Sequence, residues 1–221
     1  MDPALVQTVQ RLRQKGLYDD VGAPIKEGKE SIILLAYLGG VQRIIKVHKI
    51  ETSKFEKMME YLTGDPRFAR ARMHNRRAIL YAWSRKEFAN LRRSRNAGVR
   101  CPEPYGVLNN VVVIEFIGDA QPAPLLREAD LEDPQRTFNE IIEQYRKLYK
   151  AGLVHADMSE YNILVHDGAP WFIDFAQAVV HAHPKAQEFF ERDVTNIVRY
   201  FKKSYGIDAN VEDVMKKITS R

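Results

Sequence analysis

Three polar residues in the second half of the chain, Asp157, Asn162 and Asp174, have types and spacing suited to binding a hard cation. Asp157 ends the run His-Ala-Asp, Asn162 follows it five residues later, and Asp174 lies in the run Ile-Asp-Phe. Two carboxylates and an amide supply the oxygen ligands that Mg²⁺ prefers. Each residue alone is more often a turn or capping residue, so the prediction depends on the joint pattern.

The segment between these residues predicts a β-hairpin that brings them together. Its two β-rich runs, 163–165 and a second run ending at Asp174, flank Asp167-Gly168, a pair that favours a tight turn with positive φ. The hairpin places the loop before the first strand and the end of the second strand at one edge. The pattern is typical of phosphotransferases with a kinase-like fold, in which one Asp accepts a proton and an Asn and a second Asp hold the metal.

A lysine and a glutamate in the first half are predicted to form a buried ion pair. Lys46 lies at the end of a β-rich run over 41–47, and Glu87 falls on the apolar stripe of a helix predicted over 77–97. A carboxylate that faces a core is unfavourable unless it meets a cation, so Lys46 is the expected partner. A strand lysine of this kind can bind nucleotide phosphates.

A polar run over 25–31, centred on Gly28, is predicted to cover a nucleotide. It precedes a hairpin predicted over 32–47, and it is neither a Walker loop nor the G-x-G-x-x-G run of ordinary kinases. Lys29 and the hydroxyl and N–H of Ser31 are the groups that can reach phosphate oxygens there.

The composition changes after Ile117 from β-rich runs to proline and polar residues, which indicates a boundary between two lobes. We predict one α+β domain with a two-lobed, protein-kinase-like fold. Its β-rich lobe covers 1–117 and its mainly helical lobe covers 118–221. Backbone groups of Glu115 and Ile117 would line the cleft at this boundary and can bond an adenine edge.

The remaining segments are mostly predicted helices. The run 55–76 is long, basic and interrupted by Gly64-Asp65-Pro66, so we predict a mobile segment. A helix over 137–150 is predicted only to pack in the core. Asp193 is predicted to cap a helix that ends at Gly206. Further helices are predicted from Asp2-Pro3 to Gly16 and from Asn210 to Ile218.

The bulk composition favours a cytoplasmic protein without membrane contact. The chain has 221 residues, a net charge of +5 and one cysteine, which excludes an internal disulfide. No apolar run approaches the ~20 residues of a membrane span, and the N-terminus lacks a signal-peptide pattern. Basic residues cluster between 67 and 95, which indicates either a solvated basic face or a surface for RNA or phosphate. They are Arg67, Arg70, Arg72, Arg76, Arg77, Arg85, Lys86, Arg92, Arg93 and Arg95.

The chain resembles the RIO family of atypical protein kinases, most closely its first, archaeal-type subgroup. The resemblance covers nearly the whole chain. It rests on G-K-E-S at 28–31, I-K-V-H around Lys46, K-E-F-A-N-L around Glu87, H-A-D-M-S-E-Y-N at 155–162 and I-D-F-A-Q-A-V at 173–179. It implies a kinase reduced to its core that uses ATP with Mg²⁺, or Mn²⁺ in its place.

The resemblance also implies a role for each site residue. Asp157 would be the catalytic aspartate, Asn162 and Asp174 the metal ligands, and Lys46 the phosphate-binding lysine. Asp174 would also carry a phosphoaspartate, and Glu160 joins the nucleotide-binding residues. The implied function is a serine/threonine kinase or an ATPase switch in small ribosomal subunit maturation. The implied partners are the pre-ribosomal particle, its rRNA and a protein substrate.

Two departures from ordinary protein kinases and two rival interpretations accompany this assignment. Ala176 replaces the glycine of D-F-G, and no A-P-E follows, so neither the usual in/out flip nor a peptide-docking site is expected.

A small-molecule phosphotransferase of the aminoglycoside or choline kinase kind shares H-x-D-x-x-x-x-N, but few residues follow Asp174 to build its pocket. A non-catalytic assembly factor is disfavoured by the intact Lys46, Asp157, Asn162 and Asp174.

Overall fold

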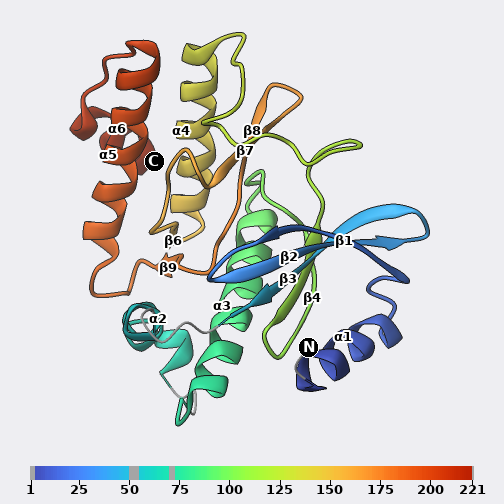
Figure 1. Cartoon of the computed structure of the whole chain (residues 1–221). Helices are drawn as coiled ribbons and strands as arrows, with labels where there is room; N and C mark the ends of the chain where they lie inside the picture. Colours follow the sequence, from blue (N-terminus) through green and yellow to red (C-terminus); the bar gives the residue numbers. More distant parts are fainter. Residues whose placement is uncertain (1–2, 50–54, 70–72, 221) are drawn as a thin grey trace.

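A five-stranded antiparallel sheet stands beside a group of helices in the computed structural model, which describes residues 3–49, 55–69 and 73–220 (Figure 1). The strand order is β1-β2-β3-β5-β4. The predicted cap Asp2 and the basic residues Arg70 and Arg72 lie outside the described residues. The strands are β1 (Asp20–Glu27), β2 (Ser31–Leu38), β3 (Val41–His48), β4 (Pro104–Leu108) and β5 (Val111–Glu115).

Both tight hairpins of this sheet turn through residues that readily adopt positive φ. β2 and β3 pair from Leu38↔Val41 to Ser31↔His48 through Gly39 and Gly40, which both have positive φ. β4 and β5 pair through a turn in which Asn109 has φ 54°. β5 also pairs with β3, so Lys46 lies on a central strand with neighbours on both sides.

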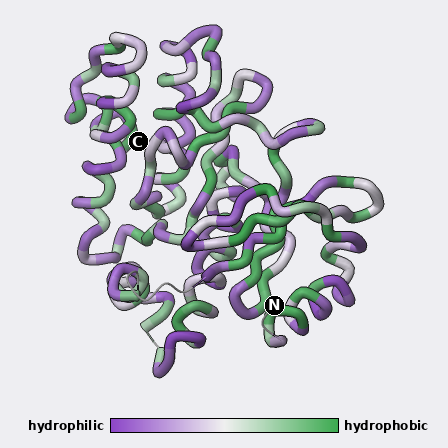
Figure 2. The backbone as a smooth tube through the Cα atoms, viewed as in Figure 1, coloured by the Kyte–Doolittle hydropathy of each residue, from purple (hydrophilic) through white to green (hydrophobic). Residues whose placement is uncertain are grey.

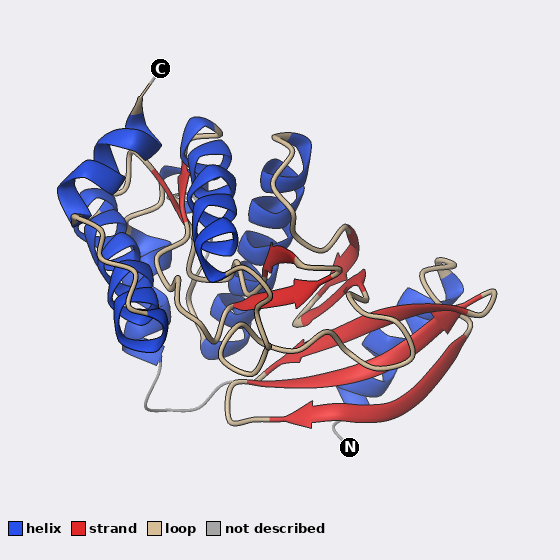
Figure 3. Cartoon of the chain, turned by 90° about the horizontal axis from the view of Figure 1, so that it is seen from above, coloured by secondary structure: helices blue, strands red, loops and turns tan. Residues whose placement is uncertain are grey.

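Side chains along β3 point alternately to the two faces of the sheet, so the two faces have different partners. Ile45 and Val47 join a core cluster with Leu12 of helix α1 (Pro3–Gln14), which covers one face of the sheet. Lys46 and His48 therefore point to the other face, where both contact Glu87 of helix α3 (Arg76–Asn96). Figures 1 and 3 show α3 beside the large sheet.

The second half of the chain is mainly helical. Helix α4 (Pro134–Lys150) packs beside α5 (Ala186–Tyr205) and α6 (Val211–Thr219). Two short two-stranded sheets lie between these helices and the large sheet. Figure 2 shows hydrophobic segments along the strands of the large sheet and on parts of the helices. These short strands are β6 (Leu153–Val154), β7 (Ile163–His166), β8 (Ala169–Phe172) and β9 (Val179–Val180).

The prediction of a mobile segment over 55–76 is wrong for most of its length. Residues Phe55–Thr63 form helix α2, and Pro66–Phe68 form the short 3-10 helix η2. Tyr61 is buried against Phe189 of α5, with ring centroids 5.0 Å apart. Gly64 packs so closely on His183 that an added Cβ would lie 2.3 Å from its Nε2. The apolar residues of α2 have helical spacing, and this packing outweighs the basic composition.

The helix boundaries in the second half agree with the predictions except at Asp193 and at the start of α4. That helix begins at Pro134, three residues before the predicted start. Gly206 ends α5 in the left-handed conformation, and the Asn210 side chain caps α6. Asp193 caps nothing, because α5 already begins at Ala186 and Asp193 lies buried in its middle. Its carboxylate binds another part of the chain, as described below.

Candidate active site

A cleft lies between the large sheet and the helical half of the chain. It has a volume of about 520 Å³, within the usual range for sites that bind small molecules. Eight of the nine residues that were assigned to nucleotide or metal binding line it, whereas Glu160 does not. These eight are Lys29, Ser31, Lys46, Glu87, Glu115, Ile117, Asn162 and Asp174.

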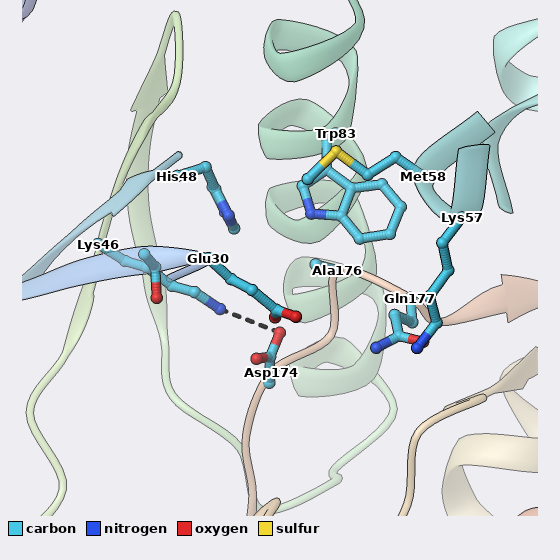
Figure 4. A pocket seen from close by; sticks show the side chains of 10 residues that line it. Glu30, Lys46, His48, Lys57, Met58, Trp83, Asp174, Ala176 and Gln177 are labelled. Atoms are coloured by element: carbon cyan, nitrogen blue, oxygen red, sulfur yellow. Dashed lines mark hydrogen bonds and ion pairs between the residues drawn. The ribbon is translucent and has the colours of Figure 1, made fainter. Parts of the chain in front are cut away.

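Lys46 lies at the inner end of the cleft between two carboxylates. Its Nζ is 2.6 Å from Glu87 Oε1. The same Nζ is 3.0 Å from Asp174 Oδ1 (Figure 4). The predicted Lys46–Glu87 ion pair is therefore confirmed. His48, on the same face of β3, places Nε2 2.6 Å from the other oxygen of Glu87. Burial favours the neutral forms, but the opposite charges outweigh it, so the pKa of Lys46 is raised and that of Glu87 is lowered.

The hairpin of the helical half brings the three predicted polar residues together. Asp167 and Gly168 have φ values of 51° and 69°, as the turn requires. The Asn162 amide donates to the Asp157 carbonyl at 2.7 Å and to Asp157 Oδ2 at 3.1 Å. The second strand ends at Phe172, two residues earlier than predicted, and Asp174 follows in the left-handed region.

Asp193 anchors the loop that carries Asp157. Its carboxylate accepts from the backbone N–H groups of Ala156 and Met158, at 2.7 and 2.9 Å, and from the Tyr145 hydroxyl at 2.6 Å. Sequence reasoning missed this role, and it assigned the helix containing Tyr145 to core packing alone. A charged residue on the apolar stripe of α5 was the available signal, the same signal that singled out Glu87.

A second anchor holds the segment that follows Asp174. Lys86 is fully buried, and its Nζ donates to the carbonyls of Ala176, Gln177 and Ala178. Asn90, one turn along α3, donates to the carbonyls of Phe175 and Ala178 at 2.9 and 2.7 Å. The assignment of Lys86 to a basic surface is therefore wrong. Burial lowers the pKa of Lys86 to about 7, and the three carbonyls satisfy its donors.

The two carboxylates of the site have opposite pKa shifts. Burial and the nearby charge of Asp174 raise the pKa of Asp157 to about 6. Burial alone would raise the pKa of Asp174 too, but Lys46 outweighs it and lowers the pKa to about 2. Asp174 is thus ionised throughout the physiological range, while Asp157 can exchange a proton near neutral pH.

The donor atoms at the cleft fit a magnesium–nucleotide complex. The nitrogen of the Asn162 amide is engaged by Asp157, which leaves its oxygen for a cation. Asp174 keeps 38% of its side chain exposed and uses one oxygen for Lys46. Over the described ranges, no three His, Cys, Asp or Glu residues form a metal site by themselves. This arrangement fits Mg²⁺, which commonly takes few protein ligands and completes its shell with phosphates and water.

The basic residues between 67 and 95 do not all face solvent. Arg76, Arg77, Arg85 and Arg92 are exposed on α3. Arg67 and Arg93 are also exposed, but Arg67 pairs with Asp65 and Arg93 donates to the Ala151 carbonyl. The half-buried Arg95 pairs with Glu103. In the part of the chain that the structure describes, no helix is long and apolar enough to cross a membrane.

The sheet, the Lys46–Glu87 pair on β3 and α3, and the Asp157–Asn162–Asp174 group together define a protein-kinase-like fold. A solved structure of the Rio2 kinase–ADP/Mg²⁺–phosphoaspartate complex from Chaetomium thermophilum shares this fold. It has a TM-score of 0.73 and 24% identity over 97% of this chain and 66% of that one.

Sequence comparison then gives the family: a RIO domain model matches residues 27–214, and the chain belongs to the RIO family. Two archaeal relatives are named RIO-type serine/threonine-protein kinase Rio1. The one from Haloferax volcanii is 41% identical over 99% of this chain and 75% of its own length. The one from Methanocaldococcus jannaschii is 40% identical over 95% and 72%, respectively. The resemblance and the fold class inferred from the motifs are confirmed.

Proposed function

We propose that this protein transfers the γ-phosphoryl group of ATP, with Mg²⁺, to a hydroxyl or to its own Asp174. The observation that carries the proposal is the position of the Lys46 Nζ, 2.6 Å from Glu87 and 3.0 Å from Asp174 at the inner end of the cleft. A lysine held by two carboxylates is fixed in place and remains charged, as a phosphate-binding group must. The regions 1–117 and 118–221 act as two lobes that share this cleft.

The remaining cleft residues supply the other contacts to the nucleotide. The Glu115 N–H already donates to Glu103 and the Ile117 carbonyl already accepts from Ala123. The Glu115 carbonyl and the Ile117 N–H are therefore assigned to the adenine edge. Lys29, in the loop between β1 and β2, and Ser31, the first residue of β2, bind phosphate oxygens. Glu160 has no such position, so we assign it no contact with the nucleotide.

Asn162 and Asp174 are assigned to Mg²⁺, with Mn²⁺ as a substitute. The bound cation neutralises charge on the phosphates. Asp157 accepts the proton of an attacking hydroxyl, for which its pKa of about 6 is suited. Asp174, with a pKa of about 2, is an ionised carboxylate that can itself attack phosphorus. In that step a carboxylate oxygen bonds to the γ-phosphorus and the bond to the ADP oxygen breaks.

Two findings support the phosphoaspartate. The Rio2 structure that shares this fold contains ADP, Mg²⁺ and a phosphoaspartate. The segment after Asp174 is fixed on α3 by Lys86 and Asn90, so the carboxylate stays beside the cleft. A fixed nucleophile gains rate because its orientation is set before the reaction.

We propose maturation of the small ribosomal subunit as the cellular process, in the cytoplasm, with the precursor particle and its rRNA as partners. The support is family membership and the exposed arginines Arg76, Arg77, Arg85 and Arg92, which can neutralise RNA phosphates. The hydroxyl that accepts the phosphoryl group can belong to water. The alternative acceptor is a protein serine or threonine, as the names of the relatives indicate.

The test is a single-turnover incubation with γ-labelled ATP and Mg²⁺, followed by hydroxylamine. Label that hydroxylamine removes, and that Asp174→Asn lacks, indicates an acyl phosphate. Acid-stable label on serine or threonine that is absent from Asp157→Ala indicates direct transfer to a hydroxyl. Asp208→Asn, a substitution of an exposed aspartate, is the matched control and keeps the wild-type pattern. No label of either kind, together with no release of labelled phosphate from ATP, overturns the proposal.

A further inference from the structure

Gln177, three residues after Asp174, reaches back to Asp157. Its Nε2 donates to Asp157 Oδ2 at 2.8 Å. The Asn162 amide donates to the same oxygen at 3.1 Å. Two donors therefore converge on Oδ2, and no hydrogen bond from the described residues reaches Oδ1. The two oxygens of this carboxylate are not equivalent.

The backbone around Gln177 is itself held by hydrogen bonds from Lys86 of α3. Its carbonyl accepts from the buried Lys86 Nζ at 3.1 Å, and the carbonyls on both sides of it accept from the same amine. Lys86 stands next to Glu87, the partner of Lys46, on α3. One turn of α3 thus fixes both the phosphate-binding lysine and the residue that orients Asp157.

A small cavity adjoins the cleft at this point, and Figure 4 shows its lining. It shares Ser31, Lys46 and Asp174 with the cleft, and Lys57 and Gln177 line its other side. The Gln177 Oε1 is buried and has no hydrogen-bond partner among the residues that the structure describes. An unpaired buried acceptor is unfavourable unless a ligand supplies the donor.

We infer that Gln177 is a positioning residue that selects Oδ1 of Asp157 as the oxygen that takes the acceptor's proton. This inference rests on the proposed phosphoryl transfer to a hydroxyl, either of water or of a serine or threonine. The acceptor oxygen bonds to the γ-phosphorus, its proton passes to Asp157 Oδ1, and the bond to ADP breaks with its electron pair on the ADP oxygen. Gln177 holds the carboxylate in the orientation that this step requires.

The experiment compares steady-state ATP hydrolysis and directly measured ATP affinity in wild type and Gln177→Met. Methionine has similar volume and no amide, so the carboxylate loses one donor while the cavity stays filled. Small errors in orientation cost large factors in rate, so we expect kcat to fall about 10- to 100-fold. The dissociation constant for ATP should change less than twofold, because Gln177 does not line the nucleotide cleft.

Gln144→Met is the matched control for loss of a buried glutamine amide. Gln144 accepts from the Arg100 N–H at 2.7 Å, away from the cleft, so its loss lowers the unfolding midpoint and leaves kcat unchanged. Lys86→Met provides a second variant that releases Gln177 without altering it, and it should lower kcat in the same direction.

Three results would overturn the inference. A Gln177→Met protein whose kcat stays within twofold of wild type would do so. Equal losses in kcat and ATP affinity would also do so, since they indicate general disruption of the cleft. A kcat loss in Gln144→Met as large as that in Gln177→Met would show that any buried amide has this effect. A wild-type protein that transfers no phosphate to any acceptor would refute the proposed function, and the inference with it. The three results above would refute the inference alone, because in them the wild-type protein remains active.

Discussion

The Lys46 side and the Asp157 side of the cleft hold their carboxylates by different means. Around Lys46, full charges compensate one another: Glu87 and Asp174 share the ammonium group, and His48 approaches Glu87. Around Asp157, the donors are neutral amides, because Asn162 and Gln177 bind its carboxylate. The first setting lowers the pKa of Asp174 to about 2, and the second leaves that of Asp157 at about 6.

The difference separates two tasks that a phosphotransferase must perform. A group that binds phosphate or metal, or that attacks phosphorus, must keep its charge, and opposite charges ensure this. A group that accepts a proton works best with a pKa near the working pH, and neutral donors orient it without removing its basicity. Substitutions on the two sides should therefore change different quantities.

The largest effect is expected on the Asp157 side. Asp157→Asn keeps the shape of the side chain but removes the proton acceptor, so kcat for transfer to a hydroxyl should fall about 10²- to 10⁴-fold. ATP affinity should stay near the wild-type value, because the Lys46 cluster is intact. Steady-state kinetics and direct binding of ATP measure the two quantities. A matching loss of ATP affinity would contradict the division between the two sides.

The Lys46 side should respond in binding and stability. Glu87→Gln removes a buried charge that the Lys46 ammonium group and the His48 ring contact, at 2.6 Å each. Loss of one partner of a buried ion pair commonly costs about 3–5 kcal/mol of unfolding free energy. ATP affinity should fall as well, since Lys46 loses its anchor. Denaturant unfolding and binding assays test this, and unchanged stability would show that the pair is not the anchor.

The pH dependence should show the same division. Asp157 with a pKa of about 6 must be ionised to accept a proton, so kcat should fall about tenfold for each unit of pH below 6. Asp174, with a pKa of about 2, contributes no limb to this profile. A kcat that stays constant between pH 7 and pH 5 would exclude Asp157 as the proton acceptor.

The two carboxylates with raised pKa values should contribute to the free energy of unfolding in the opposite direction over the same pH range. Asp157 and Asp193 have folded-state pKa values of about 6, above the ordinary value of 3.8, so the folded protein binds protons more readily than the unfolded chain. The contribution of these two carboxylates to the free energy of unfolding should therefore rise as pH falls from about 7 to about 4. Buried His155, whose pKa is lowered to about 4, opposes it over this range. The stabilisation from ionised Asp174 is lost below 3.8, as pH falls toward 2. Urea titrations at a series of pH values measure this.

The sequence predicted the parts of the site that depend on local patterns. Asp167-Gly168 predicted the turn that brings Asn162 toward Asp174, and the apolar stripe of α3 predicted the contact between Glu87 and Lys46. These inferences held because turn chemistry and helical periodicity are properties of short segments. The family resemblance was confirmed over residues 27–214.

The supports of the site depend on tertiary contacts and were not predicted. Lys86 and Asn90 occupy the same stripe of α3 as Glu87, so their burial could have been inferred, but their partners could not. These partners are carbonyls about ninety residues away, in a segment whose path is set only after the hairpin packs. Gln177 carried no signal of its own, because a glutamine in a loop usually faces solvent.

The smallest effect is expected at an ion pair whose geometry almost matches that of Lys46 and Glu87. Lys202 and Asp208 approach to 2.7 Å, against 2.6 Å in the cleft, but their side chains are 62% and 77% exposed. Lys46 and Glu87 are 9% and 2% exposed. Water and salt screen the exposed pair, so Asp208→Ala should change the unfolding free energy by only about 0–1 kcal/mol.

The response to ionic strength should also distinguish the two ion pairs. Raising the ionic strength should remove what little Asp208 contributes, whereas the effect of Glu87→Gln should persist because a mostly buried pair is screened much less than an exposed one. Denaturant unfolding of both variants at low and high salt measures this. Equal losses in the two variants would mean that distance sets the strength of these interactions. Unequal losses would mean that the burial of Lys46 and Glu87 makes the cluster an anchor for the cleft.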